Sequence, residues 1–331
     1  MAISAERTPT LRSPKSFDSL LRSVPEAVSF AKLEAETSEM AKTPEGKFTL
    51  AYLLAARNIL KPVLTDTLIN NDLLQPVGGY EYNPQRTIDD VGTAIAFKLA
   101  QETPDLPNFW IRSEEDARWQ PAKRNDAHWP DASLFAVLDP MDMTVGIPKG
   151  NRVQTTGIAI YDKKGDIKSI GIMSLVDDGM LFIENNHKPY VYSHTASEKV
   201  NTNESSGPIQ IATLTRRMHA LRNLPIFAEG NGAWTQDCAS GYAVLSLLDH
   251  KVDTILDPTK GQPWYEYVIW GKAAELAGLT VTDPTGHPID TAHIMREAIT
   301  KNPDESYRIP VVMSRTPEIQ QRVLSLLSSQ K

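Results

Sequence analysis

The feature that most constrains this sequence is an apolar run that ends abruptly at two aspartates, within the segment LFAVLDPMDMTVGIPK at residues 134–149. A short continuous apolar run is typical of a strand covered on both faces. Pro140 lacks the backbone N–H that a sheet ladder needs, so we expect the strand to end and the chain to turn at Asp139. The sequence therefore places Asp139 and Asp142 together at the exit of a buried strand, with Thr144 close behind.

This pair of aspartates has two interpretations. Carboxylates that converge at a strand exit, with a hydroxyl nearby, are the hard oxygen ligands that suit Mg²⁺. A bare Asp-x-x-Asp is more commonly a solvated turn or a helix cap, because so short a motif often occurs by chance. The remainder of the chain has to decide between a metal site and a turn.

The composition restricts the class of protein. A chain of 331 residues predicts one large or two closely packed domains. No segment approaches the 18 apolar residues of a membrane span, and a net charge of -7 without a Lys/Arg block argues against a nucleic-acid surface. Cys238 is the single cysteine, which excludes an intramolecular disulfide, and the N-terminal residues lack the apolar core of a signal peptide. We therefore expect a cytoplasmic protein.

The order of helix and strand patterns predicts an α/β fold. Thr43 and Pro44 form a helix start, and we expect Pro62 to interrupt or kink that helix. Residues 155–184 alternate apolar and polar positions between turn signals, which predicts an antiparallel three-stranded meander. The polar segment 198–208 is the best candidate for a domain junction. The predicted parts are a tail and lead-in at 1–42, an α+β domain with the metal site at 43–205, and an α/β domain on the substrate side at 206–331.

Two further acidic pairs precede the aspartate motif. Asp89 and Asp90 begin a predicted helix, where acids ordinarily cap the helix or complement its dipole. Glu114 and Glu115 follow the apolar stretch NFWIRS, and a run of acids in isolation is usually a solvent-facing charge. Taken alone, neither pair indicates a site.

The order of these motifs resembles that of the inositol monophosphatase and fructose-bisphosphatase superfamily. The superfamily signature Asp-Pro-Ile/Leu-Asp-Gly-Thr is matched by DPMDMT at 139–144, with Met143 in the place of glycine. A Gly-Glu-Glu at the end of the preceding strand is matched by Ser-Glu-Glu at 113–115. Later segments resemble the Gly-x-x-Asp strand, the Pro-Trp-Asp helix and the Thr-Asp-x-x-Gly hairpin, so that the resemblance covers roughly residues 43–330.

The resemblance implies a layered α-β-α-β-α sandwich of the sugar phosphatase type, with an N-terminal α+β half and a C-terminal α/β half. It also implies a Mg²⁺-dependent phosphatase that hydrolyses a small phosphate monoester, such as an inositol phosphate or a sugar phosphate. One ion would be held by Glu114, Asp139 and the carbonyl of Met141, and a second by Asp139, Asp142 and an acid after Trp264.

Other roles also follow from the resemblance. Glu114 and Thr144 would polarise the attacking water, and Asp89 or Asp90 would support a third ion. The substrate side would comprise the amides of Met143 and Thr144, which would cradle the phosphate, together with Glu115 and Asp257, of which Asp257 would hold substrate hydroxyls.

The acid after Trp264 is displaced relative to the superfamily pattern. Counting back from Ala277 it is Glu266, whereas counting forward from Trp264 the position is occupied by Tyr265, so one residue has been inserted. A helix turns about 100° per residue, so we expect Glu266 to reach the site only if the insertion is absorbed before it. The alternative is that Glu266 is simply an acid in the first turn of a helix.

The functional prediction has an alternative in another class. Met143, the Tyr265-Glu266 pair and the Asp237-Cys238 pair all depart from the superfamily pattern. They leave open a catalytically impaired relative that acts as a ligand-binding or regulatory protein. A 3′-phosphonucleotide phosphatase within the superfamily is a third possibility. For an active enzyme we expect Mg²⁺ as cofactor, a small phosphorylated metabolite as substrate, no nucleic-acid or membrane partner, and a possible homodimer.

Overall fold

The computed structural model describes the chain at residues 39–65, 76–80, 83–103, 105–106, 109–114, 118–122, 132–142, 153–177, 179–184, 189–192, 208–214, 226, 232–238, 240–303 and 306–328.

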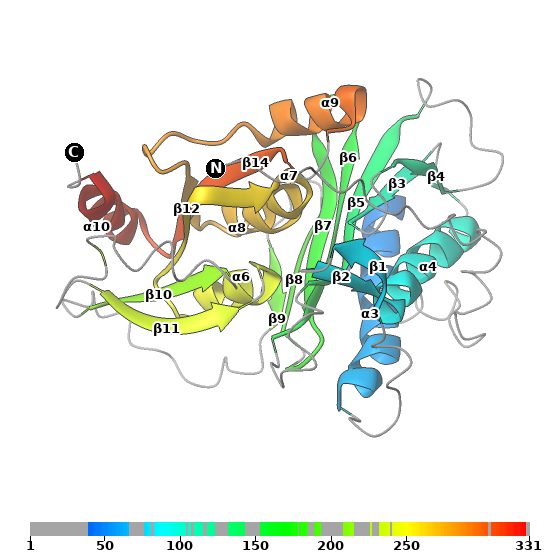
Figure 1. Ribbon diagram of the computed structural model, residues 1–331. Helices are drawn as coiled ribbons and strands as arrows, with labels where there is room; N and C mark the ends of the chain where they lie inside the picture. Colours follow the sequence, from blue (N-terminus) through cyan, green and yellow to red (C-terminus); the bar gives the residue numbers. More distant parts are fainter. Residues whose placement is uncertain are drawn as a thin grey trace, which may run out of the picture.

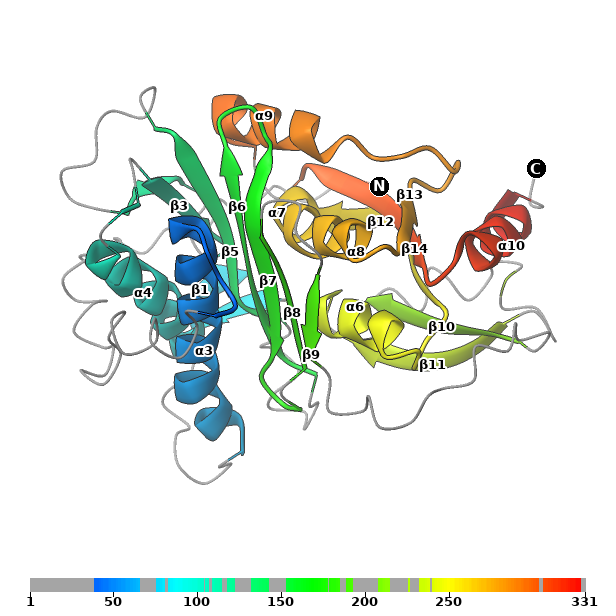
Figure 2. The same cartoon turned by 180° about the vertical axis from the view of Figure 1, so that it is seen from behind.

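The described chain forms five layers (Figures 1 and 2). Helices α3 (Pro44–Thr65) and α4 (Thr87–Glu102) cover one face of a seven-stranded sheet. Between this sheet and a five-stranded sheet lie α6 (Ser240–Leu248), α7 (Trp264–Glu266), the π-helical turn η4 (Tyr267–Gly271) and α8 (Lys272–Leu276). Helix α10 (Pro317–Ser328) covers the far face of the five-stranded sheet. The predicted layered sandwich is confirmed.

The seven-stranded sheet has the order β4-β3-β5-β6-β7-β8-β9. Its strands are β3 (Phe109–Ser113), β4 (Gln120–Pro121), β5 (Leu134–Asp142), β6 (Thr155–Asp162), β7 (Ile167–Ser174), β8 (Met180–Glu184) and β9 (Tyr190–Tyr192). Only β3 and β5 run parallel among the described pairs of this sheet. Strands β6, β7 and β8 form the predicted antiparallel meander.

The five-stranded sheet has the order β11-β10-β12-β14-β13. Its strands are β10 (Ile209–Leu214), β11 (Gly232–Cys238), β12 (Thr254–Pro263), β13 (Thr280–Thr282) and β14 (Arg308–Ser314). Strand β10 is parallel to both β11 and β12, while β14 is antiparallel to β12 and β13. Helix α9 (Thr291–Lys301) follows β13, and a small hairpin of β1 (Pro76–Tyr80) and β2 (Asn83–Arg86) precedes α4. The predicted domain boundary remains a prediction, since most of segment 198–208 lies outside the described residues.

Three apolar cores separate the layers. Residues of α3 and α4 pack with one face of the seven-stranded sheet, for example Phe48 edge-on against Phe109. The opposite face of that sheet, including Val137, packs with η4 and α6 in a central core. A smaller core that contains Val323 lies beneath α10. The central core therefore joins the two sheets.

The N-terminus of α3 forms as the sequence predicts. The Thr43 hydroxyl accepts a 3.1 Å hydrogen bond from the amide of Gly46, which satisfies one of the free N–H groups of the first turn. Pro62, however, does not interrupt the helix, because α3 continues to Thr65. Pro62 lies in the last turn and lacks the N–H that would donate to the Asn58 carbonyl, so one helical hydrogen bond is missing there.

Strand β5 departs from the sequence prediction at Pro140. We expected a turn at Asp139, but the strand continues to Asp142. Its register against β6 shifts between Asp139 and Asp142, which pair with Gly157 and Thr155. An irregularity of this kind leaves the intervening residues outside the ladder, so the missing N–H of Pro140 costs no sheet hydrogen bond.

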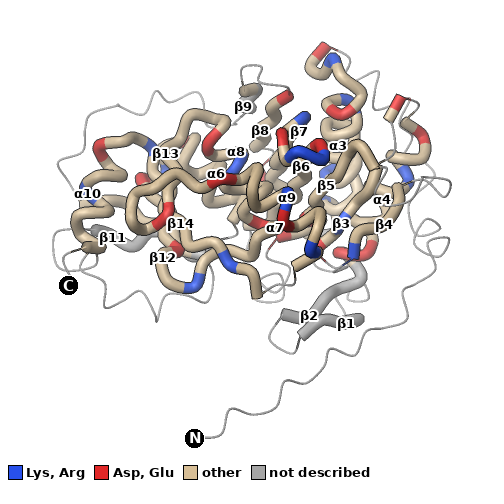
Figure 3. Tube along the Cα trace, turned by 90° about the horizontal axis from the view of Figure 1, so that it is seen from above, with Lys and Arg blue, Asp and Glu red and all other residues tan. Residues whose placement is uncertain are grey.

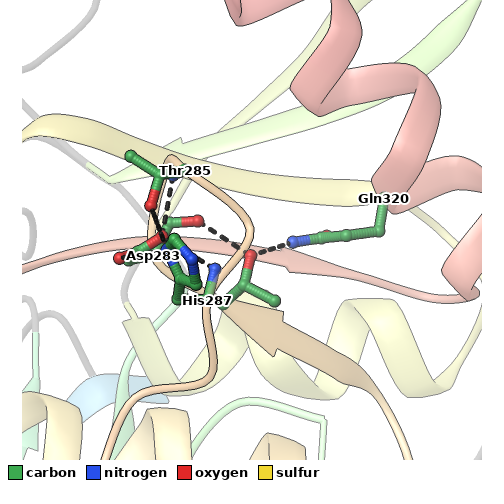
Figure 4. A network of polar contacts seen from close by, with 5 residues as sticks. Asp283, Thr285, His287 and Gln320 are labelled. Atoms are coloured by element: carbon green, nitrogen blue, oxygen red, sulfur yellow. Dashed lines mark hydrogen bonds and ion pairs between the residues drawn. The ribbon is translucent and has the colours of Figure 1, made fainter.

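The turn after β13 resembles the predicted Thr-Asp-x-x-Gly hairpin and is closed by its own aspartate (Figure 4). Asp283 Oδ1 accepts hydrogen bonds from the amides of Thr285 at 2.8 Å and His287 at 3.0 Å. Gln320 of α10 donates to the hydroxyl of Thr282 at 2.6 Å. The turn is thereby fixed against α10.

Charges of both signs are interspersed along the described trace (Figure 3). No helix among the described residues is long and apolar enough to cross a membrane.

Candidate active site

Glu114 and Asp139 leave the carboxyl ends of two neighbouring parallel strands. Ser113 of β3 pairs with Leu138 of β5, and the amide of Glu114 donates to the Leu138 carbonyl at 2.8 Å. Because side chains alternate along a strand, Asp139 lies on the same face as Val137, which packs in the central core. The sheet register therefore brings the two carboxylates together at its inner face, at the end of the strands where open α/β sheets bind ligands.

Further carboxylates lie around this pair. Burial raises the pKa of Glu114 well above its usual value, and repulsion from Glu266, Asp142 and Asp89 raises it further. Burial likewise raises the pKa of Asp139, followed by repulsion from Glu114, Asp142 and Glu266. We call Glu114, Asp139, Asp142, Glu266 and Asp89 the acidic cluster.

Asp139 shows that the acidic cluster fits a cation. Its side chain is 1% exposed, and neither carboxylate oxygen accepts a hydrogen bond from a donor among the described residues. The adjacent polar group is the carboxylate of Glu114, with which it forms a hydrogen bond only by sharing a proton. Buried carboxylates that lack donors are strongly unfavourable unless a positive charge compensates them. An oxygen-only set of this charge suits a hard divalent cation such as Mg²⁺.

The carboxylates are close enough to repel one another but do not converge on one point. Among the described residues, no group of three or more His, Cys, Asp or Glu side chains is arranged to hold a metal ion as it stands. Two members of the acidic cluster, Asp142 and Glu266, accept hydrogen bonds from the start of α6.

The start of α6 contacts two members of the acidic cluster. The amide of Gly241 donates to Asp142 at 3.1 Å, and the hydroxyl of Ser240 donates to Glu266 at 2.9 Å. The close approach of α6 to β6 and η4 requires glycine at position 241, because a Cβ there would lie 2.4 Å from the Thr155 hydroxyl and 2.9 Å from the Trp270 ring. The partial positive charge of a helix N-terminus favours carboxylates here. Sequence reasoning missed Ser240, although serine at a helix start is a recognisable signal.

The helix after Trp264 is irregular. Glu266 ends α7, and the following turn η4 is π-helical over Tyr267–Gly271. A π-turn holds one residue more than an α-turn. Glu266 lies close enough to Glu114 and Asp139 to raise the pKa of both carboxyl groups, while Tyr265 is 3% exposed and packs in the central core. The position of the inserted residue relative to Glu266, and the role of Glu266 as a metal ligand, remain predictions.

Helix α4 brings Asp89 to the acidic cluster. Asp89 is fully buried in the first turn, and its charge contributes to the raised pKa of Glu114. The helix is held by a 2.8 Å hydrogen bond between the hydroxyls of Thr93 and Ser113, at the end of β3. Asp90 is half-buried beside Asp89, and its predicted role remains a prediction.

Several predicted site residues are not tested by this geometry. The Met141 side chain packs in the core beneath α3 and α4, which leaves the proposed role of its carbonyl a prediction. Glu115, Met143 and Thr144 lie outside the described residues.

Asp257 is buried in an irregular part of β12. It pairs with Val311, and the next paired residue of β12 is Gln262, so the intervening residues bulge from the strand. Asp257 is fully buried, and its Oδ1 accepts a 3.1 Å hydrogen bond from the amide of Gly261, which closes the bulge. The structure therefore gives Asp257 a local structural role, and its predicted contact with substrate hydroxyls remains a prediction.

The five layers form a sandwich of the sugar phosphatase type, and the acidic cluster lies within it. The chain has the fold of inositol monophosphatases. It matches the extragenic suppressor protein suhB from Bartonella henselae with a TM-score of 0.61 and 14% identity, over 86% of this chain and 98% of that one. It matches an inositol monophosphatase from Zymomonas mobilis with a TM-score of 0.57 and 13% identity, over 87% of this chain and 99% of that one.

A third similar structure is an IMPase/NADP phosphatase complexed with Mg²⁺ and phosphate, with a TM-score of 0.56 and 14% identity, over 85% of this chain and 93% of that one. No family model and no curated protein matches the sequence. The resemblance inferred from the motifs is thus confirmed at the level of the fold.

Proposed function

We propose that this protein is a Mg²⁺-dependent phosphatase that hydrolyses a small phosphate monoester of the inositol phosphate or sugar phosphate class. The observation that carries the proposal is the buried carboxylate of Asp139, which lies beside Glu114 and accepts no hydrogen bond from a donor in the part of the chain that the structure describes. The similarity to an IMPase/NADP phosphatase complexed with Mg²⁺ and phosphate supports the choice of cation.

Four carboxylates of the acidic cluster would hold Mg²⁺, namely Glu114, Asp139, Asp142 and Glu266, with the Met141 carbonyl as a further ligand. When bound, Mg²⁺ stabilises the negative charge that develops on a transferring phosphoryl group. The charges of Glu114, Asp142 and Glu266 all raise the pKa of Asp139, so Asp139 lies close to all three carboxylates.

The protein would orient and deprotonate the attacking water through Glu114, assisted by the Thr144 hydroxyl. Asp89 or Asp90, at the start of α4, would support a third ion. The amides of Met143 and Thr144 would bind the phosphate oxygens of the substrate.

A catalytically impaired, ligand-binding relative is the second candidate. It is favoured by the departures from the superfamily pattern at Met143, Tyr265-Glu266 and Asp237-Cys238, and by the hydrogen bonds that Asp142 and Glu266 accept from the start of α6. Such a protein would bind a phosphorylated metabolite without hydrolysing it.

Mg²⁺-dependent release of phosphate from a mixed panel of substrates tests the proposal. The panel contains inositol phosphates, sugar phosphates, sugar bisphosphates and adenosine 3′,5′-bisphosphate, with Asp139→Asn as the inactive control. Release from inositol or sugar phosphates that is lost in Asp139→Asn supports the proposal. Preference for the adenosine bisphosphate would instead indicate a 3′-phosphonucleotide phosphatase. Binding without release would indicate the ligand-binding relative.

A further inference from the structure

Arg112 is a buried cation that the proposed chemistry does not use. It lies in β3 with 2% of its surface exposed, two residues before Glu114. Because strand side chains alternate, Arg112 and Glu114 project from the same face of the sheet. Its partner in β5 is Val137, a central-core residue, so this face is the one that meets α7.

The Arg112 guanidinium contacts two other parts of the chain. Its central carbon lies 4.6 Å from the centre of the Trp264 ring, a cation–π arrangement. Its Nη1 donates to Asn302 Oδ1 at 2.7 Å and to the Pro303 carbonyl at 3.2 Å, just after α9. Arg112 therefore joins β3, α7 and the end of α9.

Trp264 shares one of these contacts. Its indole N–H donates to the same Pro303 carbonyl at 3.2 Å, and its backbone amide donates to the Tyr307 carbonyl at 3.0 Å. Trp264 is the first residue of α7, and Glu266 follows two residues later in that short helix. The two stacked side chains, Arg112 and Trp264, thus each stand two residues before a carboxylate of the acidic cluster.

We propose that Arg112 is a positioning residue that sets the distance between Glu114 and Glu266. These carboxylates come from strand β3 and helix α7, far apart in sequence, and their like charges drive them apart. The stacking of Arg112 on Trp264 and the shared Pro303 carbonyl oppose that separation. A lysine would keep the charge but lose the planar, forked guanidinium on which both contacts depend. This inference rests on the proposed function, because it assigns the two acids to one metal site.

The alternative is that Arg112 only stabilises the core. A double-mutant cycle between Arg112→Lys and Glu266→Gln distinguishes the two, with Mg²⁺ affinity measured by calorimetry on the full chain. If Arg112 positions Glu266, Arg112→Lys in the parent weakens Mg²⁺ binding on the order of 10-fold, as loss of an outer-sphere partner does. In the Glu266→Gln background, Arg112→Lys then causes no further loss of Mg²⁺ affinity. Equal losses in both backgrounds, or no loss in either, would overturn the proposal.

Two more variants separate positioning from stability. Asn302→Gly removes the amide that Arg112 binds while keeping the backbone, because Asn302 has a positive φ of 45° that glycine adopts freely. Trp119→Phe is the matched control, since its indole also donates to α9, at the Ala298 carbonyl at 3.2 Å, but its ring packs edge-on against Phe135 of β5. Asn302→Gly should weaken Mg²⁺ binding as Arg112→Lys does, and Trp119→Phe should leave it within about twofold of the parent, below the outer-sphere effect.

Hydrogen exchange distinguishes failure of this inference from failure of the proposed function. If the parent binds no Mg²⁺, the proposed function is wrong, and amide exchange over residues 264–271 still tests the contact network. Exchange there that rises in Arg112→Lys and Asn302→Gly, but not in Trp119→Phe, supports the positioning of α7 by Arg112. Exchange that is unchanged in the first two variants would overturn it.

Discussion

The hydroxyl of Ser240 donates a 2.9 Å hydrogen bond to the carboxylate of Glu266, which joins the first residue of α6 to the last residue of α7. The next amide along α6, that of Gly241, donates to Asp142 at the end of β5. One helix start therefore holds carboxylates from both halves of the chain. In the metal-free protein these bonds offset part of the repulsion within the acidic cluster.

Glu266 and its neighbour Tyr265 should differ sharply when substituted. Glu266→Gln removes a charge from the acidic cluster, so we expect Mg²⁺ binding and kcat to fall at least 10-fold. Tyr265 packs edge-on against Trp264, with ring centres 6.0 Å apart, and Tyr265→Phe keeps that ring. We therefore expect Tyr265→Phe to change both quantities little. Calorimetry and steady-state kinetics test the pair, and equally small effects would remove Glu266 from the site.

Asp139→Asn and Asp142→Asn should abolish Mg²⁺-dependent activity, because a neutral amide does not replace a charge shared between cations. In the presence of a chelator, Asp139→Asn should instead raise the free energy of unfolding by about 1 to 3 kcal/mol, since it removes a buried charge. Chemical denaturation with and without Mg²⁺ measures both effects. A destabilised chelated variant would show that Asp139 is a structural group at the strand end.

The metal-free protein should lose stability as the pH rises from about 4 toward neutrality. The usual pKa values of Glu114 and Asp139 are 4.5 and 3.8, and both are raised in the folded state, first by burial. Below these values both states are protonated. Above them the unfolded chain ionises while the folded chain retains protons, so stability falls by at most about 1.4 kcal/mol per pH unit for each retained proton. Thermal melts in chelator should show this slope, and Asp139→Asn should reduce it.

Two substitutions of Asp257 should distinguish its contribution to stability from its contribution to substrate binding. Asp257→Ala leaves the buried amide of Gly261 without its acceptor and should cost about 1 to 3 kcal/mol of stability. Asp257→Asn keeps an acceptor oxygen and should be near the parent in stability. If Asp257 also grips substrate hydroxyls, Asp257→Asn should raise KM more than it lowers kcat. An unchanged KM for every accepted substrate would restrict Asp257 to closing the bulge.

Tyr161→Phe should destabilise the π-helical turn after Glu266. The Tyr161 hydroxyl donates a 2.5 Å hydrogen bond to the carbonyl of Val268, within η4. Loss of that donor removes one hydrogen bond to this buried carbonyl, at a cost of about 0.5 to 1.5 kcal/mol. Denaturation midpoints test the stability, with Tyr52→Phe as a control that loses a hydroxyl contact of 2.9 Å to Thr156 on the other face of the sheet. A Tyr161→Phe variant as stable as the parent would show that η4 does not need this contact.

Much of the fold could be predicted from local patterns. The strand at 134–139, the meander at 155–184 and the cap at Thr43 each depend on side-chain periodicity or turn chemistry within a few residues. The predicted five layers followed from the order of such patterns together with the superfamily resemblance. The proximity of Glu114 to Asp139 was implied by the superfamily resemblance alone, since the parallel pairing of β3 with β5 is known only from the structure.

Other features depended on contacts between distant segments. The sequence could not show that β5 continues past Pro140, since the register shift exists only relative to β6. It could not show that a π-helical turn follows Glu266, because that turn depends on how Trp270 and Tyr161 pack across the central core.

The sequence by itself determined which carboxylates are present, their order, and the strands and helices that carry them, because these depend on neighbours along the chain. Only the tertiary structure decided that Ser240 binds Glu266, that Asp257 closes its own bulge and that Arg112 stacks on Trp264. Each of these contacts is fixed by how sheets and helices pack across the central core. That packing minimises exposed apolar surface over the whole chain and leaves no periodic pattern in the sequence around any one residue.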